Sequence, residues 1–133
     1  MPVKTKGLTR RYINLPDHAP SLPFSDAVLV GDTLYLAGRI GLDPSTGKVP
    51  SDLDEEVRFL LDGFEAVLRE AGMTMDDLVW VQIVSPDISL WEPFNRGYVK
   101  RFKKEFPARA FLGSGALVLG ARFEMLGIAV RRP

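Results

Sequence analysis

Residues 51–85, SDLDEEVRFLLDGFEAVLREAGMTMDDLVWVQIVS, contain the two clearest elements of the chain, a long helix followed by a strand. Apolar side chains recur with the helical period from Ser51 to Ala71, so we expect a helix that Ser51 caps and Gly72 ends. Leu78–Ser85 is β-branched and apolar on both faces, which is typical of a strand at the centre of a sheet. Together the two elements predict a domain in which helices pack on a sheet.

Strands are also predicted on the amino-terminal side of this helix. The β-rich runs Ser25–Val30 and Thr33–Gly38 are separated only by Gly31-Asp32, which indicates a hairpin. A further strand is expected at Arg10–Asn14, before the hairpin.

A second helix and two more strands are predicted in the last third of the chain. Ser89 and Glu92 have the spacing of a capping box, and Pro107 ends the helix that they begin. Strands are expected at Ala108–Gly113 and Ala121–Arg131.

The resulting order, β-β-β-α-β-α-β-β, predicts an α+β fold in one domain over residues 1–133, with both helices on one sheet face. The last strand is apolar on both of its faces, yet two helices are too few to cover both faces of the sheet. We therefore expect a neighbouring subunit to cover the second face.

The composition excludes several kinds of chemistry. The chain has no cysteine and a single histidine, His18, so disulfides, thiolate metal sites and a cysteine nucleophile are excluded, and we expect no metal or cofactor. His18 stands in a proline-rich segment and is expected to be exposed. The 17 basic and 17 acidic residues balance, which disfavours a nucleic-acid-binding protein. The sequence shows no signal-like segment and no long apolar run, which predicts a cytoplasmic protein that does not enter the membrane.

Two charged residues in apolar strands are candidates for a functional site. Glu124 lies on an apolar strand face, where a carboxylate is costly unless it is paired with Arg122 or another arginine, or used in chemistry. Arg109 begins an apolar strand and is suited either to an ion pair with Glu105 or Glu124 or to bidentate capture of a ligand carboxylate. The strand pattern alone leaves these alternatives open.

A series of different short motifs is spread along nearly the whole chain. They are Ala19-Pro20, Pro23–Ala27, Val30–Asp32, Leu36–Ile40, Asp43-Pro44, Thr46-Gly47, Phe94-Asn95, Tyr98, Phe106–Arg109, Phe123-Glu124 and Ile128–Val130. Pro107-Ala108-Arg109 is the most specific of them. Their order and spacing resemble the RidA/YjgF family of reactive enamine/imine deaminases.

The resemblance implies a chorismate-mutase-like fold of the bacillus type, a homotrimer, and active sites in clefts between adjacent subunits. It also implies the hydrolysis of reactive imines, which form from enamines, to 2-keto acids and ammonia. By the same resemblance Arg109 grips the substrate carboxylate, Glu124 activates water, and Asn95 lines the site.

Several positions depart from the family pattern. Phe24 stands where many members have tyrosine, and Phe111 stands where many have cysteine. Gly38 matches the glycine of a Ser-Gly-Gln segment, but Ala37 and Arg39 replace its serine and glutamine. We expect Phe24, Gly38, Arg39, Asn95 and Phe111 to bind the substrate in a bulkier, more aromatic and more cationic pocket.

Two other functions compete with deamination. Five basic residues lie between Arg96 and Lys104, and some family relatives are described as endoribonucleases or translation inhibitors. Cations near a helix carboxyl end also complement its dipole, and this interpretation fits a neutral chain better. The second alternative is a non-catalytic protein that binds a small carboxylate in the same pocket.

Overall fold

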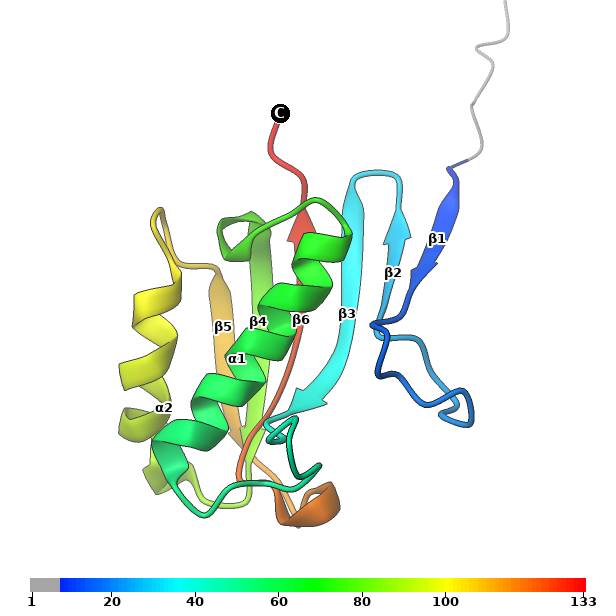
Figure 1. Cartoon of the computed structure of the whole chain (residues 1–133). Helices are drawn as coiled ribbons and strands as arrows, with labels where there is room; N and C mark the ends of the chain where they lie inside the picture. Colours follow the sequence, from blue (N-terminus) through cyan, green and yellow to red (C-terminus); the bar gives the residue numbers. More distant parts are fainter. Residues whose placement is uncertain (1–7) are drawn as a thin grey trace, which may run out of the picture.

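The computed structural model describes residues 8–133 and contains one six-stranded sheet and two α-helices in that range (Figure 1). The strands are β1 (Arg10–Ile13), β2 (Ala27–Val30), β3 (Thr33–Ile40), β4 (Leu78–Ser85), β5 (Ala108–Gly113) and β6 (Glu124–Val130). The helices are α1 (Leu53–Glu70) and α2 (Trp91–Tyr98), and short 3₁₀ turns lie at Met75–Asp77, Ile88–Leu90, Val99–Arg101 and Val118–Gly120. None of the described helices is long and apolar enough to span a membrane.

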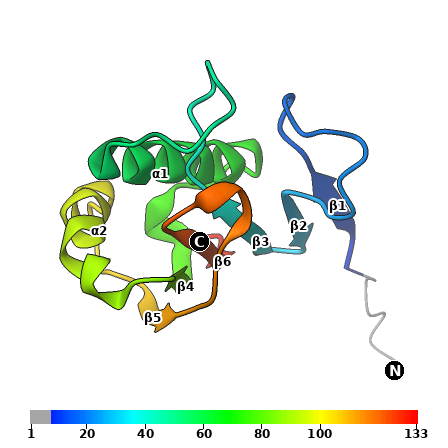
Figure 2. The ribbon, with the colours of Figure 1, turned by 90° about the horizontal axis from the view of Figure 1, so that it is seen from below.

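The sheet has the strand order β1-β2-β3-β6-β4-β5. All neighbouring strands are antiparallel except β4 and β5, which are parallel because α2 crosses over between them. Seen from below, both helices lie on the same side of the sheet (Figure 2). The predicted α+β fold and the predicted order of its elements are therefore confirmed.

The helix-covered face of the sheet forms the core. Strand register places one row of residues side by side across the sheet: Ile13, Ala27, Leu36, Gly127, Val81 and Arg109. The first five are buried beneath α1 and α2, against apolar side chains such as Leu60 and Phe64. The row therefore runs through the core and ends at a cation, Arg109, on the edge strand β5.

The opposite face of the sheet has no helix on it within residues 8–133 (Figure 2). A second register row crosses this face and consists of Tyr12, Val28, Tyr35, Ile128, Trp80 and Ala108. Tyr12 and Tyr35 in this row have more than half of their surface exposed, at 61% and 51%. The open face is thus apolar and aromatic, as the doubly apolar last strand predicts.

Several predicted element ends differ from the structure. Pro107 does not end the second helix: α2 stops at Tyr98 and is followed by the 3₁₀ turn Val99–Arg101. Helix α1 has Asp52 rather than Ser51 as its N-cap, and no side chain caps it. Asp87, not Ser89, caps the turn before α2: its carboxylate accepts from the backbone N–H and the hydroxyl of Ser89, and the Ser89 contacts lower the pKa of that carboxyl. The last strand begins at Glu124 because Arg122 leaves the strand direction to reach another partner.

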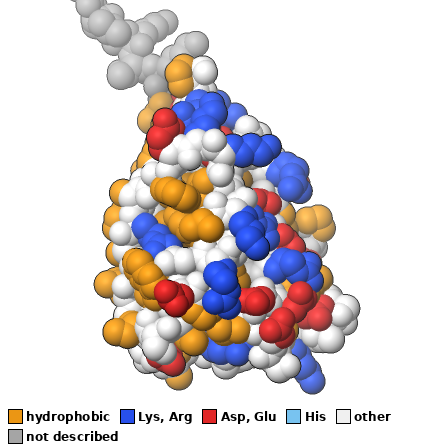
Figure 3. All heavy atoms as spheres, turned by 90° about the vertical axis from the view of Figure 1, so that its left-hand side faces the viewer, with side chains coloured by type: hydrophobic (Ala, Val, Ile, Leu, Met, Phe, Trp, Pro, Cys, Tyr) orange, Lys and Arg blue, Asp and Glu red, His pale blue; other side chains and the backbone are white. Residues whose placement is uncertain are grey.

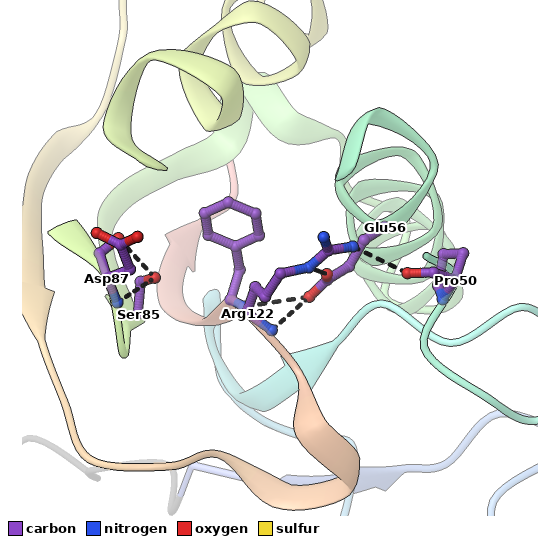
Figure 4. Close-up of polar contacts among 6 residues, drawn as sticks. Pro50, Glu56, Ser85, Asp87 and Arg122 are labelled. Atoms are coloured by element: carbon purple, nitrogen blue, oxygen red, sulfur yellow. Dashed lines mark hydrogen bonds and ion pairs between the residues drawn. The ribbon is translucent and has the colours of Figure 1, made fainter. Parts of the chain in front are cut away.

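That partner is Glu56 in the first turn of α1, whose side chain is fully buried (Figure 4). Its carboxylate accepts from the backbone N–H of Arg122 at 2.7 Å, from Arg122 Nε at 2.6 Å and from the backbone N–H of Phe123 at 3.2 Å. Arg122 Nη2 also donates to the carbonyl of Pro50 at 2.9 Å. A buried carboxylate is tolerated here because three donors, one of them the guanidinium of Arg122, compensate for its lost hydration.

Replacing Glu56 with glutamine should therefore destabilise the fold. The amide keeps the shape of the side chain, but it removes the charge and gives Arg122 and Phe123 a donor group where they need an acceptor. We expect Glu56→Gln to lower the free energy of unfolding by about 3 kcal/mol, measured by denaturant titration. Glu70→Gln, at a half-exposed ion pair with Arg11, is the matched control and should change it by less than about 0.5 kcal/mol. Equal effects of the two substitutions would contradict this assignment.

Candidate active site

Arg109 is held at the sheet edge by groups from α2. Its register partner on β4 is the buried Val81, so its side chain lies on the helix-covered face. Arg109 Nη1 donates to Asn95 Oδ1 at 2.8 Å. The guanidinium also lies 4.7 Å from the ring centroid of Trp91 and 4.7 Å from that of Tyr98. Two aromatic rings and one amide therefore fix the direction of the cation.

An open hollow of about 200 Å³ adjoins this cation. Its lining residues are Asn95, Tyr98, Val99, Phe106, Pro107 and Arg109. Phe111 does not line it, but packs against Trp91 with a centroid distance of 5.6 Å and against Phe94 at 6.0 Å. The role of Phe111 near Arg109 is therefore to support the ring that lies on the guanidinium.

No carboxylate of the described residues lies within ion-pair distance of Arg109. Both ion pairs considered from the sequence are therefore wrong: Glu105 pairs with Arg132 at 3.7 Å, and Glu124 lies elsewhere. The guanidinium therefore keeps donors that can bind an anion from outside the chain. A planar fork of this kind suits a carboxylate.

Tyr98 adds a buried hydroxyl beside the guanidinium. The residue is 3% exposed, and its Oη has no hydrogen-bond partner among the described residues. Burial raises the pKa of Tyr98 to about 12, against a smaller lowering by the nearby Arg109. The phenol is thus neutral at physiological pH and is one unused polar group next to the hollow.

Glu124 lies at the start of β6 on the other face of the sheet. It pairs in register with Val84 and Ile40, whereas the core row passes through Gly127, three residues along the same strand. Its carboxylate lies against Gly38, where an added Cβ would be 2.5 Å from Oε2. Within the described chain Glu124 has no ion pair, and the expected pairing with Arg122 is wrong because Arg122 binds Glu56. The absence of a side chain at Gly38 therefore leaves room for the carboxylate of Glu124, which has no ion-pair partner among the described residues.

A second hollow, also of about 200 Å³, lies beside Gly38. Phe24 and Arg39 line it together with residues of the segment before β2. Arg39 turns towards α1, packs on Gly63 and pairs with the buried Asp26 at 3.5 Å. The positive charge of Arg39 is therefore partly neutralised inside the chain.

The structure thus divides the expected site residues into two groups. Arg109, Asn95 and Phe111 gather on the helix-covered face at β5. Phe24, Gly38 and Glu124 gather around β3 and the start of β6. Because Arg109 and Glu124 point to opposite sheet faces, one chain does not bring them into a common cleft. No group of three or more metal-ligating side chains forms within residues 8–133.

Sequence reasoning missed the roles of three residues. Trp91 and Tyr98 both contact Arg109, a role that the sequence did not suggest for either, although their spacing from Asn95 could have indicated it. Positions 91, 95 and 98 share one helix face. His18 was expected to be exposed, but its side chain is 8% exposed and its Nδ1 lies 3.0 Å from Asp26 Oδ1. No periodic pattern marks a contact between a loop and a strand.

The fold and the arginine-centred site define a class of small α+β proteins with both helices on one face of a mixed sheet. A solved protein of the conserved Rid family from Yersinia pestis has this fold, with a TM-score of 0.84 and 33% identity. The match covers 92% of this chain and 100% of that protein.

Residues 16–131 match the family described as Endoribonuclease L-PSP. Over 128 residues the chain is 37% identical to the human 2-iminobutanoate/2-iminopropanoate deaminase, covering 95% of this chain and 93% of that enzyme. It is 35% identical over 128 residues to the goat protein of the same name, with the same coverage. The chain belongs to the RidA/YjgF family, which confirms the resemblance seen in its motifs.

The buried hydroxyl of Tyr98 gives a prediction for alkaline titration. The raised pKa means that the neutral phenol stabilises the fold below its ordinary pKa of about 10, and that this contribution is lost as pH rises through about 12. Ultraviolet titration of phenolate should show one late component near pH 12 that is missing in Tyr98→Phe. Tyr35→Phe, at an exposed ring, should leave that component in place. Its loss in Tyr35→Phe instead would contradict the assignment.

Proposed function

We propose that this protein hydrolyses imines of 2-amino acids to 2-keto acids and ammonia. The observation that carries the proposal is Arg109, a cation fixed by Asn95 and two aromatic rings and left without a carboxylate partner in the described chain. Such a cation binds and orients the carboxylate that every substrate of this class carries. Relatives at 35% and 37% identity are named for this activity.

Glu124 supplies the proton transfers. The oxygen of a water molecule bonds to the imine carbon while Glu124 takes a proton from that water. Glu124 then returns that proton to the nitrogen, and as the carbon–nitrogen bond breaks the hydroxyl of the adduct gives its remaining proton to the same carboxylate, so that a keto group forms and ammonia leaves. A protonated imine is already electrophilic, so an arginine, a carboxylate and water account for the whole reaction.

The proposed site lies between subunits of a chorismate-mutase-like homotrimer. Arg109 and Glu124 face opposite sides of one sheet, so a shared site needs the arginine of one copy and the glutamate of the next. The open face, with its exposed tyrosines, offers an apolar surface for such packing. This arrangement also accounts for the separation of the hollow beside Arg109 from the hollow beside Gly38 in each chain.

A ribonuclease function has less support. The side of the molecule that carries α2 and β5 shows basic side chains interspersed with apolar and acidic ones (Figure 3). Arg96 pairs with Asp54, and Arg101 pairs with Asp62 and Glu65, so two of the five clustered cations are neutralised within the chain. A phosphate backbone would meet a mixed surface here and not a basic stripe.

The activity is tested with imines made in situ from amino acids by an amino-acid oxidase, following keto acid release. We expect Glu124→Gln to lower kcat by at least about 100-fold, because general acid–base catalysis is worth that much or more. Arg109→Ala should chiefly raise KM, and Arg96→Ala, at an exposed ion pair, is the matched control with unchanged kinetics. A wild-type protein that binds 2-oxobutanoate but never accelerates imine loss would support a non-catalytic binding protein instead.

A shared site predicts complementation between two inactive variants. When Arg109→Ala and Glu124→Gln chains are mixed and reassembled, each interface has about one chance in four of joining an intact arginine to an intact glutamate. The mixture should therefore recover about a quarter of wild-type activity, with either variant reassembled alone as the control. A mixture no more active than its components, in which native mass spectrometry shows trimers that contain both variants, would contradict the shared site.

A further inference from the structure

The segment before β2 is fastened to the sheet by one buried carboxylate. Asp26 is 9% exposed, and its Oδ2 accepts from the backbone N–H of Leu15 at 2.8 Å. Its Oδ1 meets His18 Nδ1 at 3.0 Å and Arg39 Nη2 at 3.5 Å. The backbone of Asp26 also binds Asn14 Oδ1 and the N–H of Ala37. This cluster joins the entry segment, β2 and β3 at one point.

The contact with Asp26 determines how the imidazole of His18 is oriented. A carboxylate oxygen only accepts hydrogen bonds, so Nδ1 must carry the proton in this contact. Nε2 is then the ring nitrogen that remains available, and no described residue hydrogen-bonds to it. The ring also packs edge-on against Phe24 at 5.6 Å. The buried aspartate thus fixes the ring, and Nε2 is left available to a ligand.

His18 lines the same hollow as Gly38, against which the carboxylate of Glu124 lies. The other lining side chains include four apolar ones, Leu22, Phe24, Ile40 and Leu42. We propose that this hollow takes the side chain of the substrate and that His18 Nε2 hydrogen-bonds a polar group at its tip. His18 is then a specificity-determining residue, an inference that rests on the proposed deaminase function.

The charges in the hollow narrow the substrate class further. Arg39 is paired with Asp26, the other charged side chain that lines the hollow is Asp17, and the carboxylate of Glu124 on β6 lies against Gly38. A second carboxylate would therefore find no free cation and an unfavourable negative charge. The preferred substrate is an imine of a monocarboxylic amino acid, with an apolar stem and a neutral polar tip such as an amide.

Norvaline, glutamine and glutamate carry stems of equal length that end in a methyl, an amide and a carboxylate, so their imines form a matched series. We expect kcat/KM to be highest for the glutamine imine and lowest for the glutamate imine.

His18→Asn keeps a donor near the position of Nδ1 and loses Nε2. It should retain the melting temperature while the preference for glutamine over norvaline falls by about tenfold, the worth of one hydrogen bond in a buried site. His18→Gln, which reaches the position of Nε2 but lacks Nδ1, should lose melting temperature and keep more of that preference.

An unchanged glutamine-to-norvaline ratio in His18→Asn would overturn the inference and leave His18 a structural residue. The failure of the deaminase proposal is a separate outcome, in which wild-type protein hydrolyses none of the three imines. Binding is then read from the ring signals of His18, which are unambiguous because the chain has one histidine. A shift of Nε2 with 2-oxoglutaramate but not with 2-oxopentanoate supports the inference without catalysis, and equal shifts overturn it.

Discussion

The buried carboxylate of Glu56 fixes the relation between the helix layer and the strand on which the candidate chemistry lies. It accepts from the backbone of Arg122 and Phe123, directly before β6 begins at Glu124. A helix that slid by one turn would strand a buried charge, a cost of several kcal/mol, so the register of β6 under α1 is strongly specified. Because β6 pairs with both β3 and β4, its position in turn sets the place of Glu124 beside Gly38.

The pleat of the sheet then separates the two charged groups. Side chains alternate between faces along a strand, and in-register neighbours share a face. Arg109 belongs to the row that contains Gly127, and Glu124 stands an odd number of residues before Gly127. No rotamer of either side chain changes this parity. A reaction that needs both Arg109 and Glu124 therefore requires two copies of the chain to come together. A reaction that needs only one of the two groups does not.

The sequence predicted the elements whose signal is periodic and local. Helix α1, the central strand β4 and the element order followed from spacing, and the family followed from motif order. The predicted caps of α1 and of the turn before α2 were wrong, because Asp52 takes the N-cap position with no side-chain cap and the carboxylate of Asp87, not Ser89, caps the turn. The partner of Arg122 and the Asp26 cluster were missed for another reason: Glu56 lies 66 residues from Arg122, and no pattern along the chain records such a contact.

The surroundings of Arg109 stabilise its positive charge without an ion pair. A cation in a half-buried position is costly without compensation, and a nearby carboxylate is the common remedy. Here the compensation comes from two ring faces and an amide oxygen, which stabilise positive charge without neutralising it. Arg122 and Arg39 show the alternative, because each is matched with a buried acid within the chain. The fold thus separates Arg122 and Arg39, which are paired with buried acids, from Arg109, whose charge no carboxylate of the described chain neutralises.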